Sequence, residues 1–277
     1  MIRRLVAGCL NLPLTGSVTM AIDAFEIPKK QVGRAKRCID ELDRGIGNYF
    51  AANPVKQTLR VDRARGVQVA IRHYSEFPDE LSERVDDAIT KLRSALDQAV
   101  YAASLQIDSS LKGYERAERG LAFPIADEPN KLDFKSVSAA LHGLIRGFEP
   151  YPLTPGRSGG NHILWCLNRL ANIHKHRFLV EAQVGKQSVL ALSIGPVSEG
   201  PPAFAWNAEG RELSATLPLG SPTMVMAMIN QCIAFAEPEL VRNANIVLVL
   251  LDMYGVVDRI VGDIEAETLR ILGEQSS

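Results

Sequence analysis

The segment 161–177, NHILWCLNRLANIHKHR, gathers the side chains of this chain that are best suited to proton transfer and phosphate binding. It holds three of the five histidines, and no Asp or Glu occurs between Glu149 and Glu181. Acids and bases nearly balance over the whole chain, at a formal net charge of -1, so the positive charge of this segment is local. An imidazole exchanges protons near neutral pH, and guanidinium groups bind phosphate oxygens. The segment is therefore the first candidate for a functional site.

Helical spacing divides this segment into an apolar side and a polar side. The apolar side contains Ile163, Leu164, Cys166, Leu167, Leu170, Ala171 and Ile173. The polar side contains His162, Trp165, Asn168, Arg169, Asn172, Lys175 and His176, and Arg177 follows. Asn172 and His176 are four residues apart, so they are neighbours on a helix surface. We expect His176 to be the catalytic imidazole, because His174 projects into the apolar side, where a histidine is more often a hydrogen-bonded core residue.

A second helix, expected over residues 79–105, carries three polar side chains on one flank. Arg93, Asp97 and Tyr101 follow one another at intervals of four residues. Arg93 and Asp97 either form a surface ion pair, which contributes little to stability, or Arg93 is a second cationic group that faces His176. In the second interpretation, Arg93 and His176 are the catalytic pair and Asp97 is one of the binding residues.

The sequence motifs of several enzyme classes are absent. A zinc site needs three or four His, Cys or carboxylate ligands, whereas His174 and His176, two residues apart, point in different directions on a helix. HExxH, paired CxxC, GxSxG, Walker A and dinucleotide-binding glycine motifs do not occur. We therefore expect no metal and no cofactor. The remaining cluster of Arg, His, Asn and Lys, with Trp165 and Arg169 beside it, suits phosphate contacts, base stacking and proton transfer.

The glycine pair Gly159-Gly160 stands directly before the expected central helix. Backbone amides at a helix N-terminus can bind an anion. No strand is expected before these glycines, which favours an ordinary loop.

Bulk composition is that of an ordinary globular protein, 46% hydrophobic and 23% charged. The net charge excludes a globally basic nucleic-acid binder but not a local basic patch. Four scattered cysteines favour a reducing, cytoplasmic location, and no stretch approaches the ~20 apolar residues of a membrane span. The apolar run after Arg3-Arg4 is too short for a secretory signal. We interpret residues 1–19 as a disordered tail or a misassigned translation start, and residues 20–277 as a single domain.

Apolar periodicity predicts about five helices. They are expected from Pro28 to just before Asn53-Pro54, over 79–105, after a capping Ser136, over 161–177 and over 246–265. The short helix after Ser136 is expected to bury Val137, Ala140, Leu141, Leu144 and Phe148. Alternating residues predict two hairpins and one further strand. The hairpins are 57–61 with 67–71 around Gly66, and 178–184 with 188–194 around Gly185-Lys186; the further strand is 211–217. The segment 224–235 could be a strand or a helix, and we favour a strand because Pro222 and Pro238 bound a short apolar run. The expected fold class is therefore α+β, a helical bundle packed with an antiparallel β-sheet.

Several segments resemble an uncharacterised family of bacterial and phage proteins. They are LRSALD at 92–97, Phe123-Pro124-Ile125, Glu149-Pro150-Tyr151 and LNRLANIHKHRFL at 167–179. Members of that family carry an LRSALDH-type helix, an FPI segment and a later LxxLxNxDKHR helix. The resemblance covers roughly residues 25–265, and the KHR motif is its most specific part.

The LRSALDH motif contains Arg-x4-His and is similar to the signature of HEPN-type ribonucleases. These are helical toxin and defence proteins that cut RNA without a metal ion, often with a site formed across a dimer. The resemblance implies that Arg93 contacts phosphate and that His176 acts as acid or base. The residues with supporting roles would be Asn172, Lys175 and Arg177. The chain departs from the motifs at two positions, because Gln98 replaces the histidine after Asp97 and His174 replaces the aspartate before KHR.

Three hypotheses about function follow from these observations. The first is an RNA-binding protein or metal-independent ribonuclease of HEPN-like type, with a homodimer as a possible form. The second is a non-catalytic binding or scaffold protein, in which Asn172, His176 and Arg177 stabilise the C-terminal end of their helix. The third is an enzyme acting on a small anionic substrate, although the chain offers no evident pair of acid and base for it.

Overall fold

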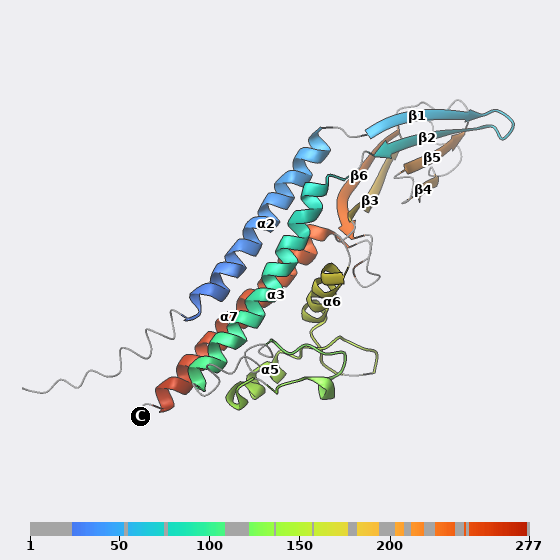
Figure 1. The fold of residues 1–277 in the computed structure, drawn as a ribbon. Coiled ribbons are helices and arrows are strands. Elements are labelled where there is room, and N and C mark those ends of the chain that lie inside the picture. The colour runs from blue at the N-terminus through green and yellow to red at the C-terminus, as the bar shows by residue number, and fades with distance from the viewer. Residues whose placement is uncertain are drawn as a thin grey trace, which may run out of the picture. The chain divides into compact units, whose positions relative to one another are not determined.

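The fold is described by a computed structural model (Figure 1), which covers most of the chain in several ranges. The described residues are 24–52, 55–74, 77–108, 122–135, 137–156, 158–176, 182–193, 203–207, 212–218, 225–235, 241 and 244–275. The segment 1–19, interpreted above as a tail or a misassigned start, lies outside them. Nothing in the structure tests the prediction of a single domain over 20–277.

Within the described residues the chain forms five α-helices, two 3-10 helices and six β-strands. The α-helices are α2 (Glu26–Ala51), α3 (Asp79–Ile107), α5 (His142–Gly147), α6 (His162–His176) and α7 (Ile246–Gln275), and the 3-10 helices are η2 (Pro129–Lys131) and η3 (Ala139–Leu141). The strands are β1 (Val55–Asp62), β2 (Val67–Tyr74), β3 (Ala182–Ser193), β4 (Ala203–Asn207), β5 (Glu212–Pro218) and β6 (Val225–Phe235). All their pairings are antiparallel. The predicted α+β class, with about five helices and antiparallel strands, is confirmed.

The chain divides into two compact units. The first unit comprises residues 1–32, 94–165 and 256–277, and the second comprises 33–93 and 166–255. The six strands therefore belong to the second unit, whereas η2, η3 and α5 belong to the first. Each of the helices α2, α3, α6 and α7 contributes residues to both units.

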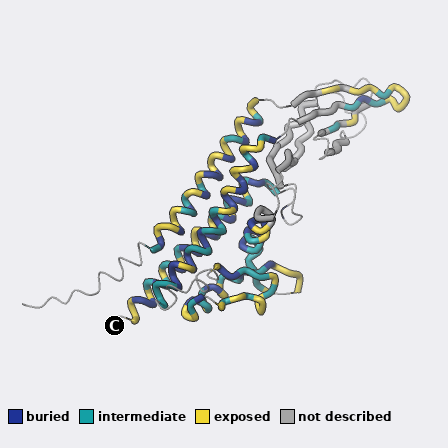
Figure 2. Tube along the Cα trace, in the orientation of Figure 1, coloured by how far each residue is buried: buried dark blue, intermediate teal, exposed yellow. Residues whose placement is uncertain are grey.

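In the second unit, α2 and α3 pack against each other in opposite directions. The ring of Tyr49, near the end of α2, lies edge-on to Phe77, just before α3, at 5.9 Å between centroids. Farther along, the side chain of Leu81 fills the space over Gly45, and Arg84 Nε lies 3.3 Å from Glu41 Oε2. Figure 2 shows buried and exposed residues recurring along these helices with helical spacing. Their buried residues include Ile39, Leu42, Ile46, Val85, Ile89 and Leu92.

The second unit also contains two antiparallel sheets. The strand order of the larger sheet is β1-β2-β5-β4. The β1–β2 hairpin was predicted, and Gly66 at its turn has a positive φ of 64°, a conformation that favours glycine. The Asp62 carboxylate accepts the Arg65 backbone N–H at 3.1 Å, a local bond typical of turns. The predicted strands 211–217 and 224–235 correspond to β5 and β6, whereas β4 was not predicted.

The hairpin predicted around Gly185-Lys186 is wrong. Residues Ala182–Ser193 form one strand, β3, which pairs along its length with β6 in a two-stranded sheet. The register shifts between Lys186 and Ser188, which leaves Gln187 as the extra residue of a bulge. A glycine in a strand often marks a bulge as well as a turn. The distant strand β6 offers a continuous partner, which the local pattern does not reveal.

Helix boundaries also differ from the predictions in places. Helix α2 starts at Glu26, two residues before Pro28, and ends at Ala51, before Asn53-Pro54 as predicted. The short helix α5 starts at His142, after η3. The predicted cap, Ser136, lies outside the described residues. Ala140 of the predicted buried stripe is exposed, and the buried Ile145 was not predicted.

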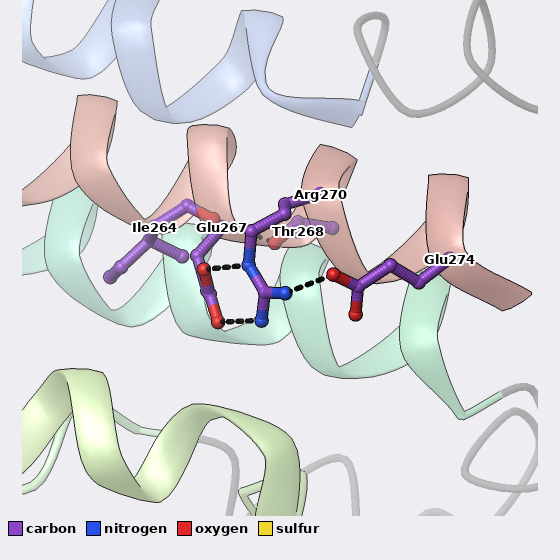
Figure 3. A network of polar contacts seen from close by, with 5 residues as sticks. All are labelled: Ile264, Glu267, Thr268, Arg270 and Glu274. Carbon is purple, nitrogen blue, oxygen red and sulfur yellow. Dashed lines mark hydrogen bonds and ion pairs between the residues drawn. The ribbon is translucent and has the colours of Figure 1, made fainter.

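Helix α7 continues ten residues beyond its predicted end at Glu265. Its buried stripe continues through Thr268, Ile271 and Leu272, and the buried Thr268 hydroxyl donates to the Ile264 carbonyl at 2.7 Å. On the exposed side, Arg270 pairs with Glu267 and Glu274, one turn away on either side (Figure 3). The predicted end fell at the charged stretch Glu265–Glu267, where the apolar spacing becomes less regular.

Candidate functional site

Helix α6 forms where its residue spacing predicted it, and its start is fixed by an N-cap. The Asn161 side-chain oxygen accepts the Leu164 backbone N–H at 3.0 Å, which satisfies one of the amide groups that a helix N-terminus leaves unpaired. Leu164, Cys166, Leu167, Leu170 and Ala171 are buried, as the apolar side of the predicted helix requires. Burial raises the pKa of the Cys166 thiol to about 11, so this cysteine remains a protonated core residue at neutral pH.

Two glycines before α6 adopt conformations that only glycine tolerates well. Gly159 has a φ of 84° and Gly160 a φ of 128°. A Cβ at Gly160 would lie 2.9 Å from the backbone carbonyl of Pro152, and one at Gly159 would collide with the carboxylate of Glu149. At Gly160 a side chain would collide with backbone atoms that cannot move aside, whereas at Gly159 the positive φ is the stronger reason for glycine.

Glu149 binds the segment just before α6 through both its carboxylate and its backbone carbonyl. Its Oε2 accepts the Gly160 N–H at 2.9 Å, and its backbone carbonyl accepts the N–H groups of Tyr151 and Asn161 at 2.6 and 2.8 Å. Glu149 itself has a positive φ of 51°, which is uncommon for a residue with a side chain. The Glu149 carboxylate thus accepts the Gly160 N–H that a bound anion would need. The structure therefore favours an ordinary loop at Gly159-Gly160 over an anion site.

Trp165 and Asp97, two of the predicted binding residues, each hold a loop segment of the first unit. The indole N–H of Trp165 donates to Asp127 Oδ1 at 2.8 Å, and its ring lies 5.6 Å from that of His162. Asp97 Oδ1 accepts the backbone N–H of the buried Phe123 at 2.9 Å. Both residues thus have a structural role. Their proposed role in binding stays a prediction.

The segment between Glu149 and Glu181 contains no acidic residue, but acidic side chains from outside it contact it in the folded protein. Asp127 and Glu149 contact its N-terminal part, at Trp165 and Gly160. From residue 166 onward, α6 exposes Arg169 and Asn172. They are three residues apart, so they lie one turn apart on the same side of the helix. The exposed polar side chains of α6 that the structure describes thus lie in its C-terminal half.

Of the proposed catalytic pair, the structure describes the side chain of Arg93 but not that of His176. Arg93, on α3, is half-buried and belongs to the same unit as Arg169 and Asn172. The helical backbone of α6 continues through His176, one turn beyond Asn172. The side chains of His174, Lys175 and His176, and the whole of Arg177, lie outside the described residues. The proximity of Arg93 and His176 therefore stays a prediction.

Three residues hold the start of α6 by hydrogen bonds that were not predicted from the sequence: Asn161, Glu149 and Asp127. The signal for Asn161 was present, because asparagine directly before an apolar periodic run is a typical cap. No local pattern indicates that Glu149, eleven residues before Gly160, turns its carboxylate back onto that amide. Asp127 lies 38 residues from Trp165, a separation at which spacing carries no information.

The described residues contain neither a cluster of metal ligands nor a membrane-spanning helix. No group of three or more His, Cys, Asp and Glu side chains lies close enough together to hold a metal ion. In the same part of the chain, no helix has the length and apolarity needed to cross a membrane. A comparison of the chain with protein-family models, with curated proteins and with solved structures finds no match.

Proposed function

We propose that this protein binds RNA along the C-terminal half of α6 and cleaves it without a metal ion. The observation that carries the proposal is the exposed pair Arg169 and Asn172, one turn apart on a helix whose opposite side is buried. A guanidinium group suits a phosphate, and an amide can bind a base edge or a sugar hydroxyl. His176 follows Asn172 by one turn of the same helix.

The proposed reaction needs no group beyond those that the chain and the RNA supply. The 2′-oxygen of a ribose attacks the adjacent phosphorus, and the bond from phosphorus to the 5′-oxygen breaks. The products are a 2′,3′-cyclic phosphate and a free 5′-hydroxyl. His176 would accept the proton of the attacking hydroxyl or give one to the leaving oxygen. Arg93 would stabilise the negative charge on the phosphate in the transition state.

The HEPN-like resemblance of the LRSALD and KHR segments supports the same assignment. A cytoplasmic location and a homodimer, in which a site could be completed across two copies, are parts of this proposal.

A second candidate is a non-catalytic binding or scaffold protein. It is favoured by the contacts of Asp97 and Trp165, which hold the Phe123 amide and Asp127. If the residues of the motifs all serve such contacts, α6 needs no catalytic residue.

The test is incubation of the purified protein with total RNA in the presence of a metal chelator. Wild type is compared with His176→Ala, Arg93→Lys and the surface variant Arg169→Gln. Arg259→Gln on α7 is the matched control, because Arg259 is also exposed and its removal changes the net charge equally. We expect cleavage by wild type and the control, loss of cleavage in His176→Ala, and weaker RNA binding in Arg169→Gln. Cleavage that is absent in wild type, or equal in all variants, contradicts the ribonuclease proposal.

A further inference from the structure

Helix α2 presents three exposed arginines on one side: Arg34, Arg37 and Arg44. At about 100° per residue, they fall within an arc of roughly 80° on the helix surface. Ten residues separate the first from the last, which corresponds to about 15 Å along the axis. We call these three residues the arginine stripe.

The arginine stripe differs from the lysines of the same helix in its charge partners. Lys29 pairs with Glu265, Lys30 with Glu26, and Lys36 with Asp40. In the part of the chain that the structure describes, no carboxylate lies within ion-pair distance of Arg34, Arg37 or Arg44. The stripe is thus a set of positive charges that the described part of the fold does not neutralise.

Two acidic residues, Asp40 and Glu41, stand at ion-pair spacing from Arg37 and Arg44, and both already have other partners; Asp40 pairs with Lys36. Glu41 lies four residues after Arg37 and three before Arg44, a spacing that would allow either to form an ion pair with it. Its carboxylate is held instead by Arg84 of α3, at 3.3 Å. These two ion pairs leave the positive charge of the stripe uncompensated.

The chemistry of the stripe fits a phosphate backbone. Guanidinium groups bind phosphate oxygens with two parallel hydrogen bonds and are more weakly hydrated than ammonium groups. One strand of a duplex carries a phosphate every ~3.4 Å of axis, so about 15 Å of helix can contact several phosphates. An anionic membrane fits less well, because a helix that lies in a membrane surface needs a broad apolar side to insert. The apolar side of α2 is buried in the protein, and Ile27 is the one large hydrophobic residue that α2 exposes within the described residues.

We propose that the arginine stripe of α2 is a second contact surface for RNA, which binds the phosphate backbone independently of sequence. The proposal rests on the proposed function, because it assigns to the same ligand a surface separate from α6. The stripe holds the phosphate chain, while α6 supplies the groups that act on the RNA.

The experiment measures RNA binding by fluorescence anisotropy over a range of salt concentrations. The probe is a labelled 20-nucleotide RNA whose 2′-oxygens are methylated, so that binding is measured without cleavage. The stripe variant is Arg34→Gln/Arg37→Gln/Arg44→Gln. The matched control is Lys29→Gln/Lys30→Gln/Lys36→Gln, which removes the same charge from the same helix at ion-paired positions. Thermal unfolding of each variant confirms that it is folded.

Three lost phosphate contacts should reduce the slope of log Kd against log salt by about 2, at ~0.7 per contact for a single strand. We expect this loss in the stripe variant, with binding at least about tenfold weaker at 0.1 M salt, and a wild-type slope in the lysine control. Glu41→Gln, which frees Arg84, should strengthen binding and steepen the slope, a gain that damage to the fold would not produce.

Each other outcome overturns a defined part of the proposal. Equal binding by the stripe variant and the lysine control overturns the role of the stripe. If Arg169→Gln still weakens binding in that case, the function proposed for α6 stands. No RNA binding by wild type overturns both assignments. Binding of wild type to vesicles of anionic lipid but not to RNA, lost in the stripe variant, overturns RNA as the ligand.

Discussion

Replacing glycine by alanine should have opposite effects at two positions of this chain, Gly160 and Gly47. Gly160 has a φ of 128°, and a Cβ there would lie 2.9 Å from the Pro152 carbonyl and 3.0 Å from the Leu153 nitrogen. Such a backbone conformation costs a residue with a side chain about 1–3 kcal/mol. The colliding atoms belong to the backbone and cannot rotate away. We expect Gly160→Ala to lower the free energy of unfolding by about 2–4 kcal/mol.

Gly47 lies on the exposed side of α2, and apart from its own stretch of helix no atom lies within 4 Å of the place that its Cβ would occupy. Alanine loses less backbone entropy than glycine on entering a helix, so Gly47→Ala should raise the free energy of unfolding by about 0.5–1 kcal/mol. The two substitutions add the same methyl group. The sign of the effect therefore depends only on the local backbone and the space around it.

Both variants can be compared by urea unfolding followed by circular dichroism, with hydrogen exchange as a local probe. At roughly 2–4 °C per kcal/mol in a chain of this size, Gly160→Ala should also lower Tm by several degrees. Faster exchange at the Leu164 amide, which the Asn161 cap binds, should accompany it. A Gly160→Ala protein as stable as wild type would refute the positive φ and the close approach to Pro152. Destabilisation by Gly47→Ala would refute the open space on α2.

The other predictions concern three single side chains. Asp97→Ala removes the acceptor of the Phe123 amide and should lower the free energy of unfolding by about 2 kcal/mol in chemical denaturation, while an unchanged value would show that another group accepts this bond. The raised pKa of Cys166 keeps its thiol protonated, so in native protein it should resist alkylation at pH 8 and react only after unfolding; rapid labelling of the native protein would contradict this. The stability that this raised pKa contributes is fully present below the ordinary thiol pKa of 9.0 and is lost as pH rises from there to about 11. Cys166→Ala should therefore lose less stability than wild type over that interval in pH-dependent urea unfolding. Arg270→Ala breaks ion pairs at a side chain that is 54% exposed, so the loss of stability measured by urea unfolding should be small and should shrink at high salt.

The predictions from the sequence succeeded where a structure depends on neighbouring residues. Helix α6 combines apolar spacing with an asparagine cap, and the β1–β2 hairpin combines alternation with Gly66 at the turn. Both signals lie within a few residues of the element that they specify. The exposure of Arg169 and Asn172 followed from the same helical spacing.

The failures involve partners far apart in the chain. Strand β3 pairs with β6, about 40 residues later, so the local pattern predicts a turn at Gly185 although this residue lies within a strand. The contacts of Asp97 with Phe123 and of Glu149 with Gly160 join residues 26 and 11 positions apart. The binding role that the spacing from Arg93 predicts for Asp97 is not tested by its contact with Phe123 and stays a prediction. The bond of Asp97 to a buried backbone amide depends on the path of the following loop, which no periodic pattern encodes.

The two halves of α6 differ in a way that bears on where a site can lie. Its N-terminal end is held by the Asn161 cap, by the bond from Trp165 to Asp127, and through Gly160 by Glu149. Catalytic groups must be held within about 0.5 Å of their working positions, which rigid elements achieve better than loops. A helix fixed at its start transmits its rotation to later residues at 1.5 Å and about 100° per residue. In the proposed function, the anchors at residues 160–165 act on Arg169 and Asn172 only through the continuous backbone of α6 and do not contact RNA. For this reason, loosening an anchor by Trp165→Phe should lower the rate of RNA cleavage more than the affinity for RNA, whereas Arg169→Gln should do the reverse.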